Sequence, residues 1–212
     1  DTSAIVNEIE KMEIDMLFII GGNGSHAGAL AIDKLCRERG LSTSVIGVPK
    51  TIDNDILLLD RTFGFQTAVD EAVKAIRSAK IEARSADNGI GLVRLMGRQS
   101  GFIAMHAALA SGSTDVCLIP EIECHLDGEG GIIAHIERVL QKQSHCVVVC
   151  AEGAGQEQLG SLGETDASGN PILVNFAKYL QTRIKESVRG ADVKYIDPTY
   201  MVRATPTNAS DA

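Results

Sequence analysis

Short apolar runs alternate with amphipathic, helix-like segments along the whole chain, and this alternation limits the possible folds more than any other feature. The strand-like runs are 16–20, 43–49, 89–96, 115–121, 145–153 and 192–197. The helix-like segments are 25–40, 62–83, 100–112, 131–143 and 175–187, and a further helix is expected before the first strand. Short, continuously apolar strands that alternate with such helices form parallel sheets covered on both faces. The pattern therefore predicts an α/β fold with three-layer, Rossmann-like parallel sheets.

The helix expected over 62–83 is long enough to join two similar sub-domains, so we place a boundary near its start. This gives one part over 1–64 and a second that begins at 65. The chain opens in what we expect to be the middle of a fold, and no signal-peptide or transit-peptide pattern stands in these 212 residues.

The composition excludes several classes of partner. The chain is 44% hydrophobic and 23% charged, which suits a globular protein with a buried core. Its formal net charge of -8 argues against nucleic-acid or membrane-surface binding, and no apolar run is long enough to span a membrane. The five cysteines are odd in number and form no CxxC pair, which predicts buried reduced thiols rather than disulfides or a zinc site.

Ligands on parallel α/β sheets bind beyond the carboxyl ends of the strands, so we examine the segments that follow each strand. These segments are GGNGS (21–25), PKTIDND (49–55), MGRQSG (96–101), PE (120–121) and AEG (151–153). In GGNGS, the glycines and the following helix N-terminus suit a phosphate group, and Ser25 is positioned to cap that helix. A purely structural turn explains the same residues equally well.

The segment PKTIDND crowds charges of both signs into one turn. Of Asp53 and Asp55, one carboxylate is suited to accept the proton of a hydroxyl nucleophile and the other to bind Mg²⁺. Lys50 is suited to neutralise charge on a transferring phosphoryl group. Taken alone, the segment is also typical of an Asx-rich turn with a solvated lysine.

Three further segments give weaker evidence of ligand binding. Arg98, at a strand end and helix start, suits an anionic or hydroxyl-rich ligand, and otherwise is a surface arginine. Glu152 suits sugar hydroxyls or simply begins a helix. Tyr200 and Arg203 form an aromatic-plus-cation pair, a spacing that is also common on protein surfaces. The histidines share no ligand spacing, so we assign no metal to them.

Taken together and in order, six stretches resemble the ATP-dependent 6-phosphofructokinases over essentially the whole chain. They are GGNGS, GVPKTIDNDI, LMGRQSGFIA, CLIPE, VVVCAEGAGQ and YIDPTYMVRA. The forms KTIDND and GFIAMHAALASG resemble the plant-type branch, and GGNGSHAGA resembles its plastid subgroup. The resemblance implies the phosphofructokinase fold, with 1–64 in the nucleotide-binding sub-domain, 65–197 in the sugar-phosphate-binding sub-domain and 198–212 returning toward the first. Family members extend beyond both ends of these residues, so we expect a central piece of such an enzyme.

The resemblance implies phosphorylation of fructose 6-phosphate by MgATP, the committed step of glycolysis. Asp53 would accept the proton of the 1-hydroxyl, with Asp55 and Lys50 as magnesium ligand and charge neutraliser. The implied sugar-phosphate contacts are Thr51, Ile52, Asp53, Met96, Gly97, Arg98, Glu152, Tyr200 and Arg203. The implied nucleotide contacts are Gly22, Asn23, Gly24 and Ser25. An allosteric homo-oligomer, dimeric or tetrameric, in the plastid or cytoplasm is expected.

Three residues bear on metal binding and on the choice of phosphoryl donor. Most of the family has aspartate where this chain has Asn23, and that aspartate meets Mg²⁺. Gly24 is the ATP-type residue, because pyrophosphate-dependent relatives carry aspartate there, whereas Lys50 is shared with the pyrophosphate type. A pyrophosphate-dependent enzyme, or a non-catalytic chain that binds sugar phosphate and regulates complete subunits, therefore stays as an alternative.

Overall fold

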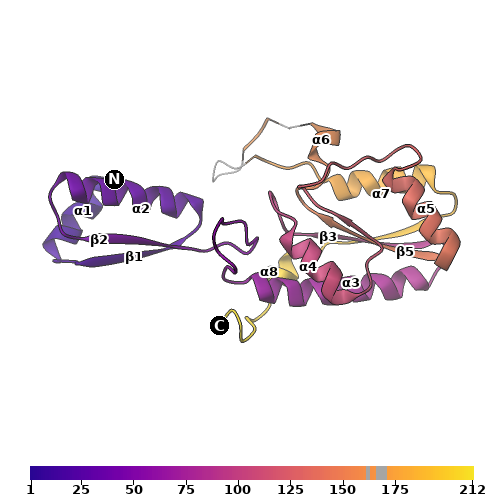
Figure 1. The fold of residues 1–212 in the computed structure, drawn as a ribbon, viewed down its shortest axis with the longest axis horizontal. Helices are drawn as coiled ribbons and strands as arrows, with labels where there is room; N and C mark the ends of the chain where they lie inside the picture. Colours follow the sequence, from indigo (N-terminus) through magenta and orange to yellow (C-terminus); the bar gives the residue numbers. More distant parts are fainter. Residues whose placement is uncertain (161–162, 166–170) are drawn as a thin grey trace. The chain divides into compact units, whose positions relative to one another are not determined.

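The computed structural model describes residues 1–160, 163–165 and 171–212. These residues divide into two compact units (Figure 1). The first unit comprises Asp1–Thr51 and Ile56–Phe63, and the second comprises Ile52–Asp55 and Gly64–Ala212. The segment Ile52–Asp55 thus belongs to the second unit, although the residues on both sides of it along the chain belong to the first.

The first unit is a two-stranded parallel sheet with two helices. Its elements are α1 (Thr2–Lys11), β1 (Met16–Gly21), α2 (Asn23–Glu38) and β2 (Ser44–Pro49). The strands pair in register from Met16 opposite Ser44 to Gly21 opposite Pro49. Successive side chains of a strand point to opposite faces, and the described helices cover the face that carries Leu17 and Ile19. The alternate side chains Met16, Phe18 and Ile20 are exposed.

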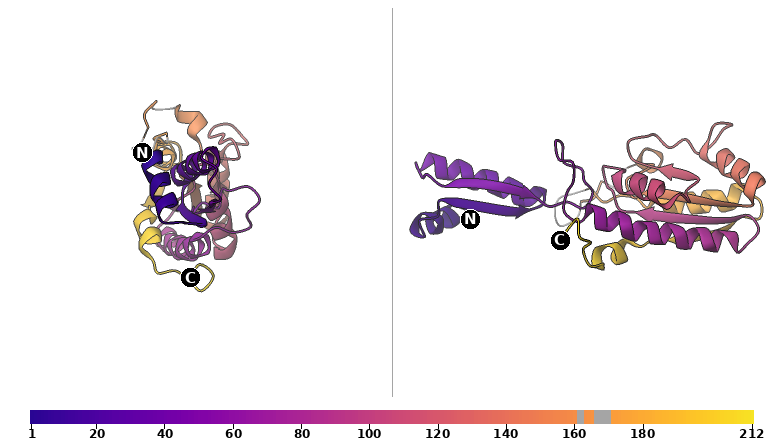
Figure 2. Two further views of the ribbon diagram at one scale, coloured as in Figure 1. Left: turned by 90° about the vertical axis from the view of Figure 1, so that its left-hand side faces the viewer. Right: turned by 60° about the horizontal axis from the view of Figure 1, so that its bottom comes forward.

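The second unit holds a four-stranded parallel sheet. Its elements are α3 (Phe65–Arg84), β3 (Gly89–Leu95), α4 (Phe102–Ser111), β4 (Val116–Leu118), α5 (Ile132–Gln143), β5 (His145–Ala151), α6 (Gln156–Leu159), α7 (Phe176–Ser187), β6 (Asp192–Ile196) and α8 (Thr199–Ala204). The strand order is β4-β5-β3-β6, and every pair is parallel. The α3 and α4 helices lie on one face of the sheet and α5 and α7 on the other (Figures 1 and 2).

The central strands β3 and β5 are buried along almost their whole length because helices pack on both of their faces. The alanine-rich side of α3 lies directly on β3. A Cβ at Gly91 would stand 2.6 Å from the carbonyl oxygen of Ala79 and 2.9 Å from its Cβ. Only glycine permits this close helix-to-strand packing.

The predicted α/β fold with parallel sheets is confirmed, and each expected strand and helix is present with ends shifted by a few residues at most. Cover on both faces is found for the sheet of the second unit. Two short helices, α6 and α8, were not expected. In the described part of the chain, no helix has both the length and the apolar composition needed to cross a membrane.

The cysteines are free thiols, as predicted, but they are not all buried. Cys36, Cys124, Cys146 and Cys150 are buried, whereas Cys117 on the edge strand β4 is exposed. Burial raises the pKa of Cys124 to about 11 and that of Cys146 to about 12, so these two thiols stay protonated near neutral pH.

The C-terminal segment supplies the missing cap of α3. Gly64 is the N-cap residue of this helix and has no side chain to accept a hydrogen bond from its first turn. Instead the carboxylate of Asp211 accepts from the Thr67 backbone N–H at 2.7 Å and from the Thr67 hydroxyl at 2.6 Å. Asn208 adds a bond from its side chain to Asp70 at 2.7 Å.

Replacing Asp211 by alanine removes this cap and the favourable negative charge at the N-terminus of α3. We expect a loss of about 1 kcal/mol in the free energy of unfolding, measured by urea denaturation. An Asp87→Ala variant, which removes an exposed aspartate from the turn before β3, is the control. Equal effects of the two substitutions would contradict the capping role.

Candidate active site

Two turns meet at the carboxyl ends of β3 and β5. The strands pair in register up to Leu95 opposite Ala151. The pairing continues beyond them, because the Glu152 N–H donates to the Leu95 carbonyl at 2.8 Å and the Gly153 N–H donates to the Gly97 carbonyl at 3.0 Å. The predicted site segments MGRQSG and AEG therefore lie side by side, as expected for neighbouring strands of a parallel sheet.

Glycine is required at both turns. Gly97 has a φ of +125°, a conformation that residues with a Cβ rarely adopt. A Cβ at Gly153 would overlap the carbonyl group of Arg98. The two backbones can approach this closely only because neither position carries a side chain.

The segment Ile52–Asp55 is held against the turn that follows β3. The Ser100 hydroxyl donates to the Asp53 carbonyl at 2.9 Å, and the Arg98 N–H points to the Asp53 carboxylate at 3.4 Å. The Ile52 side chain packs on the core formed with α3 and α4. Asn54 has a φ of +56°, in the left-handed region that asparagine tolerates better than most residues. These contacts explain why the segment belongs to the second unit.

The surroundings of Asp53 change the pKa of its carboxyl group. Burial raises the pKa of its carboxyl group from 3.8 to about 6. The backbone N–H of Arg98 opposes this rise, the carboxylates of Asp55 and Glu152 add to it, and the Arg98 guanidinium opposes it. A carboxylate that titrates near neutral pH is a competent general base, because it is largely ionised and still holds a proton well.

Glu152 is tied to a residue that the sequence did not point to. The guanidinium of Arg94 on β3 forms ion pairs with Glu152 at 2.9 Å and with Asp197 at 3.0 Å. Burial works to raise the pKa of Asp197, but hydrogen bonds from Thr199 and the charge of Arg94 outweigh it and hold that pKa below its usual value. Glu152 is thus kept in place at the carboxyl end of β5.

The other predicted residues of the second unit have different surroundings. The Met96 side chain is buried in the core, so only its backbone is available to a ligand in this structure. The Arg98 side chain donates to the Pro171 carbonyl. Tyr200 and Arg203 are exposed on α8, whose Val202 packs on the core. Within the described residues, no hydrogen bond or ion pair links either of these two side chains to Asp53.

The predicted nucleotide residues and Lys50 lie in the first unit. Gly22 is the N-cap of the 16-residue helix α2, which has no side-chain cap in the structure. The expectation that Ser25 caps this helix is wrong, because Ser25 lies inside its first turn. Lys50 and Thr51 follow β2, where the Lys50 N–H donates to the Gly21 carbonyl at 2.8 Å and the lysine is exposed.

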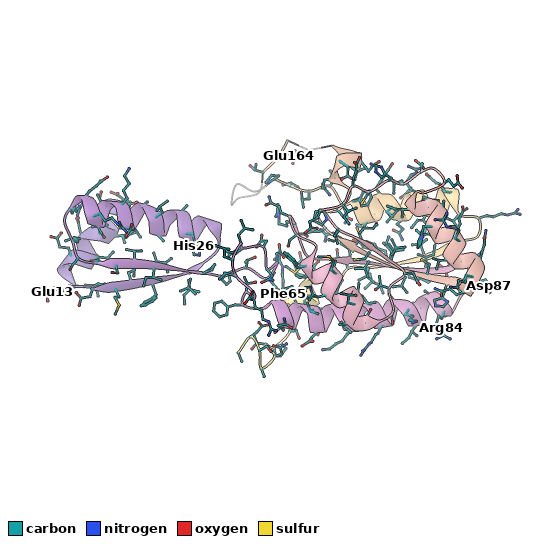
Figure 3. The ribbon with its side chains drawn as sticks, viewed as in Figure 1. Glu13, His26, Phe65, Arg84, Asp87 and Glu164 are labelled. Carbon is teal, nitrogen blue, oxygen red and sulfur yellow. The ribbon has the colours of Figure 1, made fainter. Side chains whose placement is uncertain are left out.

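His26, labelled in Figure 3, has a structural environment. Its Nε2 lies 3.1 Å from the Gly21 carbonyl oxygen, and a Cβ at Gly47 would stand 2.6 Å from its Nδ1. The ring therefore packs across β1 and β2 within the first unit.

A sequence model of the family described as phosphofructokinase matches residues 1–212, the whole chain. The chain belongs to the phosphofructokinase family. A chloroplastic ATP-dependent 6-phosphofructokinase of Arabidopsis thaliana is 54% identical over 213 residues, which cover 99% of this chain and 40% of the relative. The ATP-dependent 6-phosphofructokinase of Borreliella burgdorferi is 44% identical over 219 residues, which cover 98% of this chain and 49% of the relative. The chain therefore spans half or less of the length of these family members.

Solved structures support the same fold. A pyrophosphate-dependent phosphofructokinase from Marinobacter aquaeolei matches with a TM-score of 0.76 at 24% identity, over 99% of this chain and 51% of that one. Pichia pastoris phosphofructokinase matches with a TM-score of 0.70 at 22% identity, over 96% of this chain and 21% of that one. At these identities the likeness supports the fold and leaves the choice of donor open.

The raised pKa of Asp53 predicts a pH-dependent effect of the Asp53→Asn substitution on stability. The folded state holds the Asp53 proton more tightly than the unfolded state, so the stabilising effect of that proton is complete below pH 3.8 and is lost as the pH rises to about 6. Asparagine does not titrate. The stability of D53N relative to the wild type should therefore increase between these pH values, by at most about 3 kcal/mol, and level off above them.

Thermal unfolding across this pH range in metal-free buffer measures the effect. Asp87→Asn controls for the loss of an aspartate from the surface of the same unit (Figure 3). A D53N difference that is independent of pH would show that the Asp53 carboxyl is not perturbed.

Proposed function

We propose that the protein carrying this chain transfers the terminal phosphoryl group of ATP to the 1-hydroxyl of fructose 6-phosphate. The single observation that supports this most directly is the half-buried carboxylate of Asp53, which the turn that carries Arg98 holds at the carboxyl end of β3. The relatives named ATP-dependent 6-phosphofructokinase support the same chemistry.

In this proposal the site residues have different roles in substrate binding and phosphoryl transfer. Asp53 accepts the proton of the sugar hydroxyl as that oxygen attacks the phosphorus atom. Arg98 and the exposed Arg203 attract the anionic substrate groups, and Glu152 accepts a hydrogen bond from a sugar hydroxyl. Lys50 neutralises negative charge that develops on the transferring group. Thr51, Ile52, Met96, Gly97 and Tyr200 complete the proposed sugar-phosphate contacts.

We propose a magnesium ion that is held in large part by phosphate groups. Among them, no three or more His, Cys, Asp or Glu side chains come together as a metal site of their own. Mg²⁺ in phosphoryl-transfer sites commonly takes only one or two protein carboxylates and completes its coordination with phosphate oxygens and water. We propose Asp55 as a protein ligand, and the neutral Asn23, whose side chain lies outside the described part of the structure, as another. The ion would offset the charge of the phosphates.

ATP is the donor that we propose over pyrophosphate. The first turn of α2 offers glycine backbone and a helix N-terminus to the phosphates at Gly22 to Ser25. A Cβ added at Gly24 would meet no atom within 4 Å, so the position leaves open space in this unit. The names of three relatives that are 50% to 54% identical to the chain over the matched residues also favour ATP.

Asp53→Asn in the natural protein that carries this sequence should lower kcat by a factor of about 10² or more, because the amide cannot accept the proton. Coupled assay of fructose 1,6-bisphosphate formation measures the rate, and Asp87→Asn is the control. Turnover of D53N near the wild-type rate would refute the role of Asp53. A wild type that binds fructose 6-phosphate but shows no turnover with either donor would support the non-catalytic alternative instead.

Gly24→Asp should weaken use of ATP and leave the stability of the fold nearly unchanged. The new carboxylate enters open space but repels the phosphates of a nucleotide. We expect the KM for ATP to rise about tenfold or more, while Gly24→Ala serves as an uncharged control. A wild type that prefers pyrophosphate to ATP would overturn the proposed donor.

We further propose a homo-oligomer in the plastid or cytoplasm. Arabidopsis thaliana relatives with 54% and 48% identity are named chloroplastic, whereas those with 52% and 50% identity carry no such label. Light scattering of the purified natural protein tests the oligomeric state, and a fluorescent fusion in plant cells tests the location.

A further inference from the structure

Arg94 is the centre of a partly buried cluster of charges at the edge of the candidate site. Its two terminal nitrogens each contact a different carboxylate, Nη2 with Glu152 and Nη1 with Asp197. The side chains of Arg94, Glu152 and Asp197 are 19%, 17% and 30% exposed. The cluster is therefore shielded from water more than a surface ion pair is.

The sheet explains why one side chain reaches both acids. Arg94 lies near the end of β3, which is flanked by β5 on one side and β6 on the other. Glu152 directly follows β5, and Asp197 directly follows β6. A residue on the central strand is consequently the one that can bridge the groups after both of its neighbours.

Asp197 connects the cluster to α8. Its Oδ1 accepts hydrogen bonds from the Thr199 N–H at 3.2 Å and from the Thr199 hydroxyl at 2.5 Å, at the start of that helix. Oδ2, which pairs with Arg94, also accepts from the Tyr195 hydroxyl at 3.3 Å. The position of Tyr200 and Arg203 on α8 thus depends on a carboxylate that Arg94 holds.

We propose that Arg94 is a positioning residue for fructose 6-phosphate, which fixes Glu152 and α8 through its two ion pairs without contacting the substrate itself. The inference rests on the proposed function, since it assigns Glu152, Tyr200 and Arg203 to the sugar-phosphate site. It adds a residue to that site that the sequence motifs did not include.

The geometry requires an arginine. The planar guanidinium presents donors in a fixed fork, so one side chain can satisfy two carboxylates that approach from different strands. Lysine offers a single point charge on a flexible chain and would hold one acid well at the expense of the other. Removal of the cation leaves two partly buried carboxylates that repel each other, so Glu152 and Asp197 would both shift.

The test compares three variants of the natural protein, Arg94→Met, Arg94→Lys and Arg183→Met. Arg183 is the matched control, because it forms an ion pair with Asp127 at 2.7 Å in the same unit, is 25% exposed and has no proposed contact with the site. Calorimetric Kd for fructose 6-phosphate, the KM for each substrate, kcat and the melting temperature are measured for each protein.

We expect R94M to raise the Kd and KM for fructose 6-phosphate roughly 10- to 100-fold, while the KM for ATP changes less than about twofold. R94K should recover part of this loss, and R183M should bind as the wild type does. Because Arg94 acts partly through Glu152, R94M combined with E152Q should lose less affinity than the product of the two single losses.

Two results would overturn the inference. If R94M is folded and binds fructose 6-phosphate as tightly as the wild type, or if R183M weakens binding as much, Arg94 has only a structural role. If the wild type itself neither binds nor phosphorylates fructose 6-phosphate, the proposed function fails, and the role of Arg94 fails with it. The wild-type measurement therefore distinguishes a failure of the proposed function from a failure of the Arg94 role alone.

Discussion

The in-register parallel pairing of β3 and β5 is the interaction on which the candidate site depends. Both strands are buried between two helix layers, which fixes their register, since a slip would expose apolar side chains. The pairing extends past the strands through the bonds of Glu152 to Leu95 and Gly153 to Gly97. Arg98 and Glu152, 54 residues apart in the sequence, therefore meet on a rigid base.

The same arrangement concentrates negative charge. Asp53, Asp55 and Glu152 are close enough for the latter two to raise the pKa of the first. This costs folding stability near neutral pH, because the ionised form of Asp53 is disfavoured in the folded state. The arginines offset part of the cost, because Arg98 favours the ionised form of Asp53 and Arg94 pairs with Glu152.

The periodicity of the sequence was sufficient to predict the elements and the parallel sheets, because burial on both faces leaves short, continuously apolar runs. It was not sufficient for the charge cluster. In GLVRLM, Arg94 reads as one polar residue in an apolar strand, and its partners stand 58 and 103 positions further along. The cap of α3 by Asp211 spans 144 positions and is equally invisible to local pattern. Such contacts depend on the strand order β4-β5-β3-β6, which no local motif encodes.

The division of the motif PKTIDND between the two units has a chemical consequence. Lys50 and Thr51 belong to the first unit, whereas Ile52 to Asp55 belong to the second. The proposed proton acceptor is thus built into the same unit as Arg98, Glu152 and α8, by contacts to one sheet and its turns. Most of the residues proposed to contact the sugar phosphate are therefore preorganised by the folding of the second unit, whereas Thr51, the proposed charge neutraliser Lys50 and the glycine-rich start of α2 are preorganised by the folding of the first.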